Sequence, residues 1–369
     1  PDPGHNLPSG EDEHLVISGK ISGSGELYHF NKACALVLTN PNNDFTGGYN
    51  ADASQGRVEA RASNVFGTGT VKAHPTVDGT YWFTTADQTH PNTFVELAKV
   101  RMDTATRRVE LSGTVQDDGF DHPGAGILVL SGDNTGALTG NVLLRDEATL
   151  LLGHNNAMGA ANIQAYHQAD PANIGATGGD VVSPAGLRND IFPPLKWIFI
   201  NDDGSDLTLN GDVIMSYGST SAGVPNFEVE SGIVATLNGD FTGSVGAASD
   251  RMEKLGAGKL ILGGSNQQTH NVGVTATGWE LVNGTLGLGH DDAVQQDSTA
   301  SLIVANNANT KTITAENGTR TIANPIALNG SVNVDGSNNL TLNGTVSGTG
   351  GITKNGTGTL TLTAGTNSF

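Results

Sequence analysis

The sequence predicts an all-β fold in which short strands wind into a parallel β-helix, or β-solenoid. Three observations lead to this prediction: a segment that recurs at long intervals, a polar surface built from Asn, Thr and Ser, and apolar alternation with the period of a strand. Glycine makes up 51 of the 369 residues, about twice its average usage, whereas charged residues are 15%, well below the usual quarter. The chain is therefore expected to be an array of similar units.

The recurring segment has two anchors. The first is a short apolar run that ends at an aligned glycine, and these glycines lie 94, 126 and 105 residues apart: Gly19, Gly113, Gly239 and Gly344. The second is a glycine pair followed by Leu-x-Leu, at 124–130, 256–262 and 356–362; residues 33–38 take its place in the first copy. An Asn-rich run follows each second anchor. The copies predict repeat units at 15–108, 109–235 and 236–339, with a partial closing unit at 340–369.

Alternating runs such as 360–363 are separated by Asn-Gly or Gly-Thr-Gly turns every 8 to 14 residues. A sandwich or barrel of antiparallel hairpins has short strands too, but the repetition favours a solenoid. Glycines and asparagines at the corners are expected to accept positive φ values. With roughly 20 to 25 residues per rung, each period holds about 4 or 5 rungs.

The predicted domain organisation is uneven. Residues 1–13, with three prolines and an acidic Glu-Asp-Glu, are expected to form a flexible arm, and 14–369 form the solenoid. Residues 165–206 contain four prolines and are expected to leave the coil as a loop insertion or to pack against it. An apolar cluster at 192–200 lies inside this stretch. It is interpreted as a core strand that re-enters the helix, with a sticky partner-binding patch as the alternative.

The junction at 344–362 resembles the autotransporter-associated β-strand repeat, together with the segments on either side of it at 324–328 and 367–369. The first copy adds Asn-Asp-Phe-Thr-Gly-Gly-Tyr at 43–49, which is similar to a signature of that family. The match is specific in the last 50 residues and poor at 72–108 and 165–200. The resemblance implies a right-handed parallel β-helix exposed outside a bacterial cell. It implies no catalytic residues, because the repeat is architectural.

Composition narrows the location and the partners. A net charge of −19 argues against a nucleic-acid partner, which requires a basic footprint. No apolar run approaches 18 residues, so no membrane-spanning segment is expected. The single cysteine, Cys34, permits no internal disulfide and is interpreted as a small strand residue. We expect an extracellular protein or one on the bacterial cell surface.

The leading functional hypothesis is a structural, non-enzymatic subunit of a surface filament or stalk. The chain opens and closes on the same junction, and an uncapped rung exposes unpaired backbone groups that invite another chain. Copies of the same protein are therefore the expected partner, joined head to tail through the terminal rungs. The residues predicted to make this contact are Ile17, Ile21, Leu27, Ile352, Leu360, Leu362 and Phe369.

Two alternatives remain open. One is an adhesin or polysaccharide-binding passenger fragment of a larger autotransporter-like protein. The other is a polysaccharide lyase, since such enzymes also use parallel β-helices, but fold alone cannot assign that function and no catalytic residue is identified. No cofactor is expected. Ca²⁺ at Asp202, Asp203 and Asp206 is considered, although solvated turn acids are the preferred interpretation.

Overall fold

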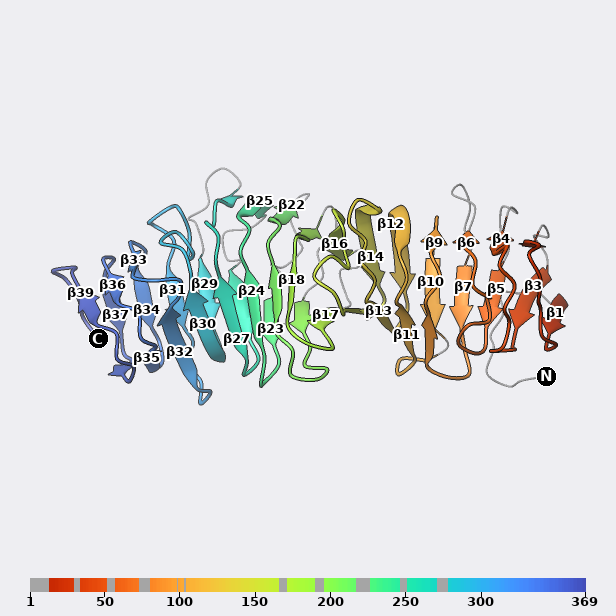
Figure 1. Cartoon of the computed structure of the whole chain (residues 1–369). Helices are drawn as coiled ribbons and strands as arrows, with labels where there is room; N and C mark the ends of the chain where they lie inside the picture. Colours follow the sequence, from red (N-terminus) through yellow and green to blue (C-terminus); the bar gives the residue numbers. More distant parts are fainter. Residues whose placement is uncertain are drawn as a thin grey trace. The chain divides into compact units, whose positions relative to one another are not determined.

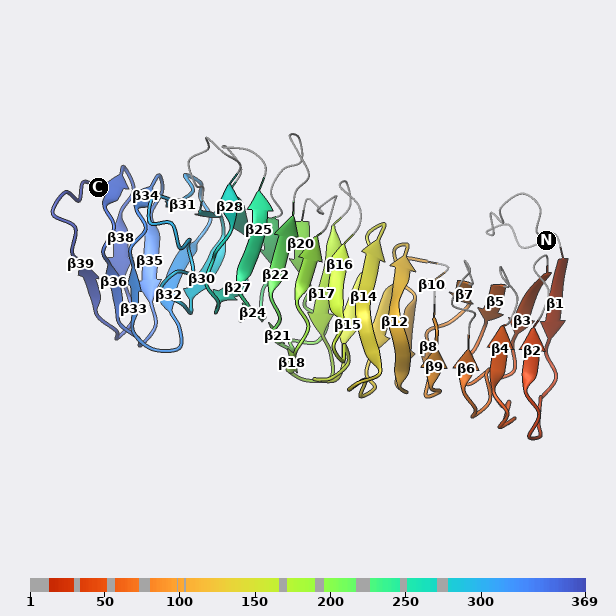
Figure 2. The same cartoon turned by 90° about the horizontal axis from the view of Figure 1, so that it is seen from above.

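The computed structural model describes residues 13–29, 34–51, 57–72, 80–97, 99–102, 104–165, 171–189, 196–216, 226–245, 251–270 and 278–369. Within these residues the protein is all-β, has no helix, and forms parallel strand pairs stacked as a β-solenoid. The predicted fold class is confirmed. The chain divides into two compact units, Pro1–Ala161 and Asn162–Phe369. In each of them consecutive strands lie side by side in chain order (Figures 1 and 2).

The first unit has three columns of stacked strands. The first column contains β1 (Glu13–Ile17), β3 (Cys34–Leu38), β5 (Arg57–Ala60), β7 (Thr80–Phe83), β10 (Lys99–Met102), β12 (Val115–Pro123) and β14 (Leu138–Arg145). The second contains β2 (Leu27–His29), β4 (Tyr49–Ala51), β6 (Val71–Lys72) and β9 (Phe94–Val95), and it joins β12. The third contains β8 (Gln88–His90), β11 (Arg108–Leu111), β13 (Ile127–Leu130) and β15 (Thr149–Leu152).

The second unit has three long columns and a short one. The first contains β16 (Asn162–Ala165), β19 (Leu187–Asn189), β22 (Val213–Ser216), β25 (Phe241–Val245) and β28 (Thr269–His270). The second contains β17 (Ala172–Ala176), β20 (Lys196–Phe199), β23 (Asn226–Val229), β26 (Met252–Leu255), β29 (Trp279–Leu281), β31 (Leu302–Val304), β34 (Ile326–Leu328) and β37 (Val346–Gly348).

The third column of the second unit contains β18 (Val181–Ser183), β21 (Leu207–Leu209), β24 (Val234–Leu237), β27 (Lys259–Leu262), β30 (Gly284–Leu288), β32 (Lys311–Ala315), β35 (Val332–Asp335) and β38 (Ile352–Lys354). The short column contains β33 (Arg320–Ile322), β36 (Leu340–Leu342) and β39 (Leu360–Leu362).

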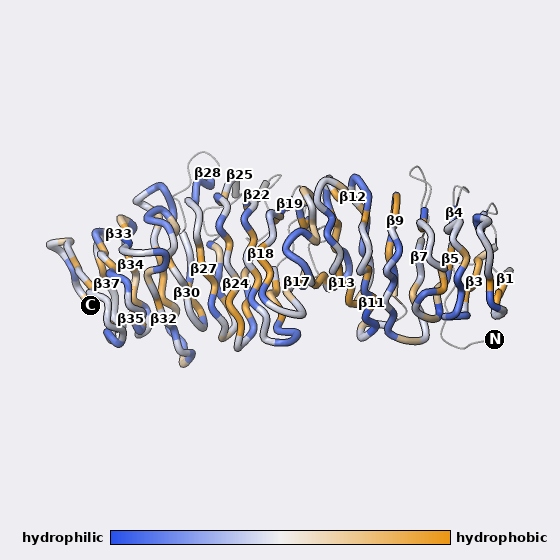
Figure 3. Tube along the Cα trace, in the orientation of Figure 1, coloured by the Kyte–Doolittle hydropathy of each residue, from blue (hydrophilic) through white to orange (hydrophobic). Residues whose placement is uncertain are grey.

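Side-chain alternation fills the interior of each unit. Strands such as β24 and β27 alternate half-buried and buried positions, so that Leu237 and Leu262 point inward and stack on each other. Apolar residues accordingly lie along the strands, and hydrophilic segments gather at the turns between them (Figure 3). Burial of these stacked Leu, Val and Ile side chains is the main stabilising contribution.

The structural repeat is the single rung. Paired residues in neighbouring rungs lie between 19 and 30 residues apart, a wider range than predicted. Moreover, the two anchors of each recurring segment occupy the same column one rung apart: Leu111 pairs with Leu130, and Leu342 pairs with Leu362. The recurrence at about a hundred residues therefore marks a corner that was strongly preserved in sequence, whereas the repeating unit of structure is much shorter.

The four aligned glycines do not serve the role predicted for them, because none has a positive φ. They are needed for space instead. A Cβ atom on Gly239 would overlap the backbone oxygen of Gly211 in the preceding rung, and Gly113 and Gly344 meet their own preceding rungs in the same way. Gly19, in the first described rung, has nothing within 4 Å of that position. Close approach between rungs thus explains these glycines.

Residues 165–206 differ from the prediction of a loop insertion. Where described, they form β17, β18, β19 and β20, which pair in register like the other strands. The reason is that Pro171 and Pro184 lie at strand ends, where a missing N–H is tolerated, and do not interrupt a strand. Trp197 and Phe199 are buried, which agrees with the core-strand interpretation. Pro193 and Pro194, residues 1–12 of the predicted arm, and the side chain of Cys34 lie outside the described residues.

Candidate functional site

The first rung of the first unit presents an uncovered edge. In the described part of the chain β1 pairs only with β3, and β2 pairs only with β4. Leu15 is 56% exposed, whereas its register partner Leu36 is 2% exposed. Tyr28 on β2 is also exposed. Residues that are core in the next rung are therefore surface here, because no described strand covers them.

The last rung of the second unit shows the same feature. Among the described residues β38 pairs only with β35, and β39 pairs only with β36. Leu360 and Leu362 on β39 are half-buried, although their partners Leu340 and Leu342 are buried. Phe369 is 49% exposed. The inward orientation of these side chains is unchanged, so only the missing neighbour on one side accounts for the exposure.

The predicted self-association residues thus fall into two groups. Ile17, Ile21 and Leu27 are half-buried in the first described rung of the first unit. Ile352, Leu360 and Leu362 are half-buried in the last rung of the second unit, where Phe369 is exposed. Each group shares one end rung. The sequence prediction omitted Leu15, which the register with the buried Leu36 now identifies.

Buried asparagines connect successive rungs at one corner of the coil. Asn43 Oδ1 accepts a hydrogen bond from Ile21 N (2.9 Å), and its Nδ2 donates to Val65 O (2.7 Å), so one side chain joins three rungs. Asn134 does the same with Val115 N (2.7 Å) and Ala157 O (2.5 Å). These side chains satisfy buried backbone groups that the turn leaves without partners. They belong to the Asn-rich runs that the sequence marked only as turns.

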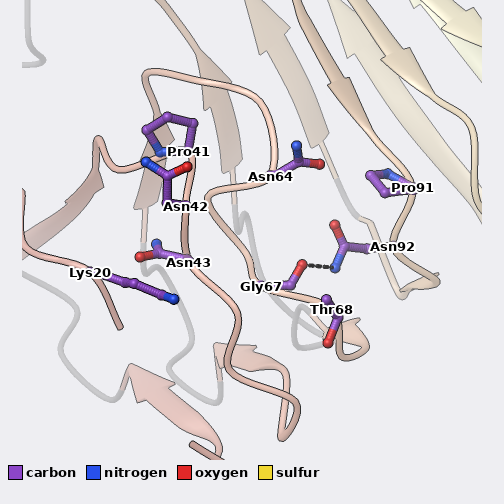
Figure 4. A pocket seen from close by; sticks show the side chains of 9 residues that line it. All are labelled: Lys20, Pro41, Asn42, Asn43, Asn64, Gly67, Thr68, Pro91 and Asn92. Carbon is purple, nitrogen blue, oxygen red and sulfur yellow. Dashed lines mark hydrogen bonds between the residues drawn. The ribbon is translucent and has the colours of Figure 1, made fainter. Parts of the chain in front are cut away.

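A groove of about 430 Å³ lies along this corner in the first unit (Figure 4). Its wall is polar and comes from four successive rungs. Most of it is formed by four asparagines, two prolines and one lysine: Asn42, Asn43, Asn64, Asn92, Pro41, Pro91 and Lys20. Because the lining residues repeat with the rung period, the groove runs across the rungs. Sequence analysis did not identify it, since it depends on which rungs become neighbours.

Asn92 ends the groove with an unusual arrangement. Its Nδ2 donates to Gly67 O (3.1 Å) and Gly69 O (2.8 Å), which fixes the plane of the amide. Its Oδ1 is buried and has no hydrogen-bond partner within the described structure. Figure 4 shows this oxygen directed away from Gly67, on the side of Pro91 and Asn64. An unpaired buried acceptor costs about 1 to 3 kcal/mol, so a donor at this position would be stabilising.

The three carboxylates considered for Ca²⁺ already have hydrogen-bond donors. Asp202, Asp203 and Asp206 accept hydrogen bonds from Thr177 Oγ1, Gly178 N and Val234 N, respectively, each at 2.6 Å. Hydrogen bonds from Ser205 and Gly178 lower the pKa of Asp203. No group of three or more metal-ligating residues occurs in the described ranges. The geometry is that of a corner in which each carboxylate joins neighbouring segments of the chain.

Lys254 is a buried cation that sequence analysis missed. Its Nζ donates to the carbonyl oxygens of Leu255 (2.5 Å), Gly256 (2.9 Å) and Asn283 (3.1 Å). Burial lowers the pKa of Lys254 to about 7, and Glu228 opposes that shift. A signal was present in the alternation of β26, because Lys254 lies two residues from the buried Met252 and thus on the inward face.

Comparisons with known proteins assign no family. No protein-family model, curated protein or solved structure matches the chain. The resemblance to the autotransporter-associated repeat therefore stays a prediction from the sequence. In the part of the chain that the structure describes, no helix has the length and apolar character needed to cross a membrane.

Proposed function

We propose that the protein is an extracellular structural β-solenoid that associates head to tail through its end rungs. The observation that carries the proposal is the pair of uncovered edges: Leu15 on β1, and Leu360 and Leu362 on β39, are exposed or half-buried, although their partners one rung inward are buried. A strand edge with free backbone groups and apolar side chains is a template for a further strand.

The two edges differ in sequence and in the elements that form them, so the contact between copies is heterologous. A heterologous contact propagates as an open chain unless the rotation between copies closes a ring. The acidic surface, with a net charge of −19, supports solubility of such an assembly outside the cell. The function is thus mechanical support, with further rungs supplied by neighbouring copies.

A pair of edge variants of the 369-residue chain tests the proposal. Leu15→Lys places a charge on the first edge, and Leu362→Lys places one on the last. Thr361→Lys is the matched control, because Thr361 lies next to Leu362 on β39 but is exposed on the outer face. Circular dichroism establishes that each variant keeps its strand content.

Analytical ultracentrifugation and electron microscopy then give the assembly state. Wild type and Thr361→Lys are expected to form oligomers whose length increases with concentration, and each edge variant alone is expected to remain monomeric. A mixture of the two edge variants should stop at dimers, since each variant retains the edge that the other has lost. Wild-type protein that stays monomeric at all concentrations would refute the proposal.

A further inference from the structure

We propose that the asparagine-lined groove of the first unit binds a neutral oligosaccharide that lies across the rungs. Shape is the first reason. The groove has contributions from four successive rungs, beginning at Lys20 and ending at Asn92. Three rung spacings give roughly 14 Å, at about 4.8 Å per spacing. Such a groove suits an extended chain of sugar rings better than a single compact metabolite.

The chemistry of the wall is the second reason. Asn42 and Asn64 are exposed, and no side-chain hydrogen bond of either is found in the described structure, so both amides are available to a ligand. An amide offers two donors and an acceptor, which matches the mixed donors and acceptors of sugar hydroxyl groups. Pro41 and Pro91 add apolar ring surface between these polar groups. Alternation of polar and apolar surface is what the face and the rim of a pyranose ring present.

The charge of the groove selects a neutral ligand. Lys20 is the only charged residue in its wall, and Lys20 forms an ion pair with Asp44 at 2.5 Å. The groove therefore offers little net positive charge, and the chain as a whole carries −19. Long-range repulsion disfavours acidic polysaccharides on such a surface. Uncharged hexose or pentose oligomers are the class that remains.

The Asn92 oxygen supplies a specific polar contact at one end of the groove. Since Nδ2 is held by Gly67 and Gly69, the amide cannot turn over to present a donor instead. Its Oδ1 lacks a donor, and a sugar hydroxyl group is a donor of suitable size. The ligand thereby satisfies a buried group that the protein leaves unpaired.

Titration calorimetry with the 369-residue protein tests the inference, using cellotetraose, mannotetraose and xylotetraose as probes. Asn64→Gly removes one groove amide without strain, because Asn64 has a φ of 59° and glycine accepts that conformation. Asn317→Gly is the matched control in the second unit, since Asn317 is also exposed and has a φ of 57°. Thr68→Trp fills the groove from an exposed wall position.

We expect saturable binding of at least one tetrasaccharide, with tighter binding than that of its monosaccharide. Loss of one hydrogen bond in Asn64→Gly should raise Kd about 2- to 12-fold. Thr68→Trp should abolish binding, and Asn317→Gly should leave Kd unchanged. The inference is overturned if none of the three probes binds, if both glycine variants weaken binding equally, or if polygalacturonate binds more tightly than every neutral probe. None of these outcomes depends on end-to-end assembly.

Discussion

Truncation of a buried corner asparagine should destabilise the coil far more than truncation of an exposed one. Asn134 is fully buried, and its side chain satisfies Val115 N–H and Ala157 C=O, which are themselves buried. Asn134→Ala leaves both backbone groups without partners, at about 1 to 3 kcal/mol each. The expected loss is about 2 to 6 kcal/mol. Asn42→Ala, at an exposed position, should change stability by less than about 0.5 kcal/mol.

Hydrogen exchange measured by mass spectrometry is the suitable assay, because stacked repeats can open locally rather than all at once. The Val115 amide reports directly, since its acceptor is the Asn134 side chain. A loss of 2 kcal/mol corresponds to about 30-fold faster exchange. If peptides that contain Val115 exchange at the same rate in Asn134→Ala as in Asn42→Ala, the structural role assigned to the buried asparagines is wrong.

Two further variants address packing and charge within the coil. Gly239→Ala should destabilise by about 1 to 3 kcal/mol, because the new methyl group overlaps Gly211, whereas Gly19→Ala, with open space around it, should melt like wild type in thermal unfolding. Equal melting temperatures for the two would contradict the close-approach explanation. Lys254 has its pKa lowered to about 7, so between pH 7 and 10 the unfolded state binds more protons than the folded state. Wild-type stability should therefore rise relative to Lys254→Met by about 1.4 kcal/mol per pH unit. Urea unfolding between pH 7.5 and 9.5 checks this, and a difference independent of pH would exclude it.

The fold was predictable because its signals are local. Strand alternation and Gly or Asn punctuation are visible within windows of ten residues, and they suffice to indicate stacked short strands. Register is a pairing between residues 19 to 30 positions apart, and the sequence does not state it. Two anchors that form the same corner in adjacent rungs were consequently assigned to one long repeat.

The polar interior was the part that could not be predicted. Asparagine is usually exposed, so an Asn-rich run indicates a turn and says nothing about which member points inward. Asn42 is exposed and its neighbour Asn43 is buried, and only the position of Ile21 and Val65 in flanking rungs distinguishes them. The groove is hidden for the same reason, since its wall is assembled from four rungs.

The uniform register of the last rungs has a consequence for how this protein can change over time. Leu340 pairs with Leu360 and Val332 with Ile352, a step of 20 residues in both columns. Each rung contacts only its neighbours, so the energy of the stack is a sum of nearest-neighbour terms. Duplication or deletion of one 20-residue segment would alter length by a single rung and preserve every remaining contact. Slippage of the coding sequence by that step is therefore structurally neutral, and length is the trait most open to selection.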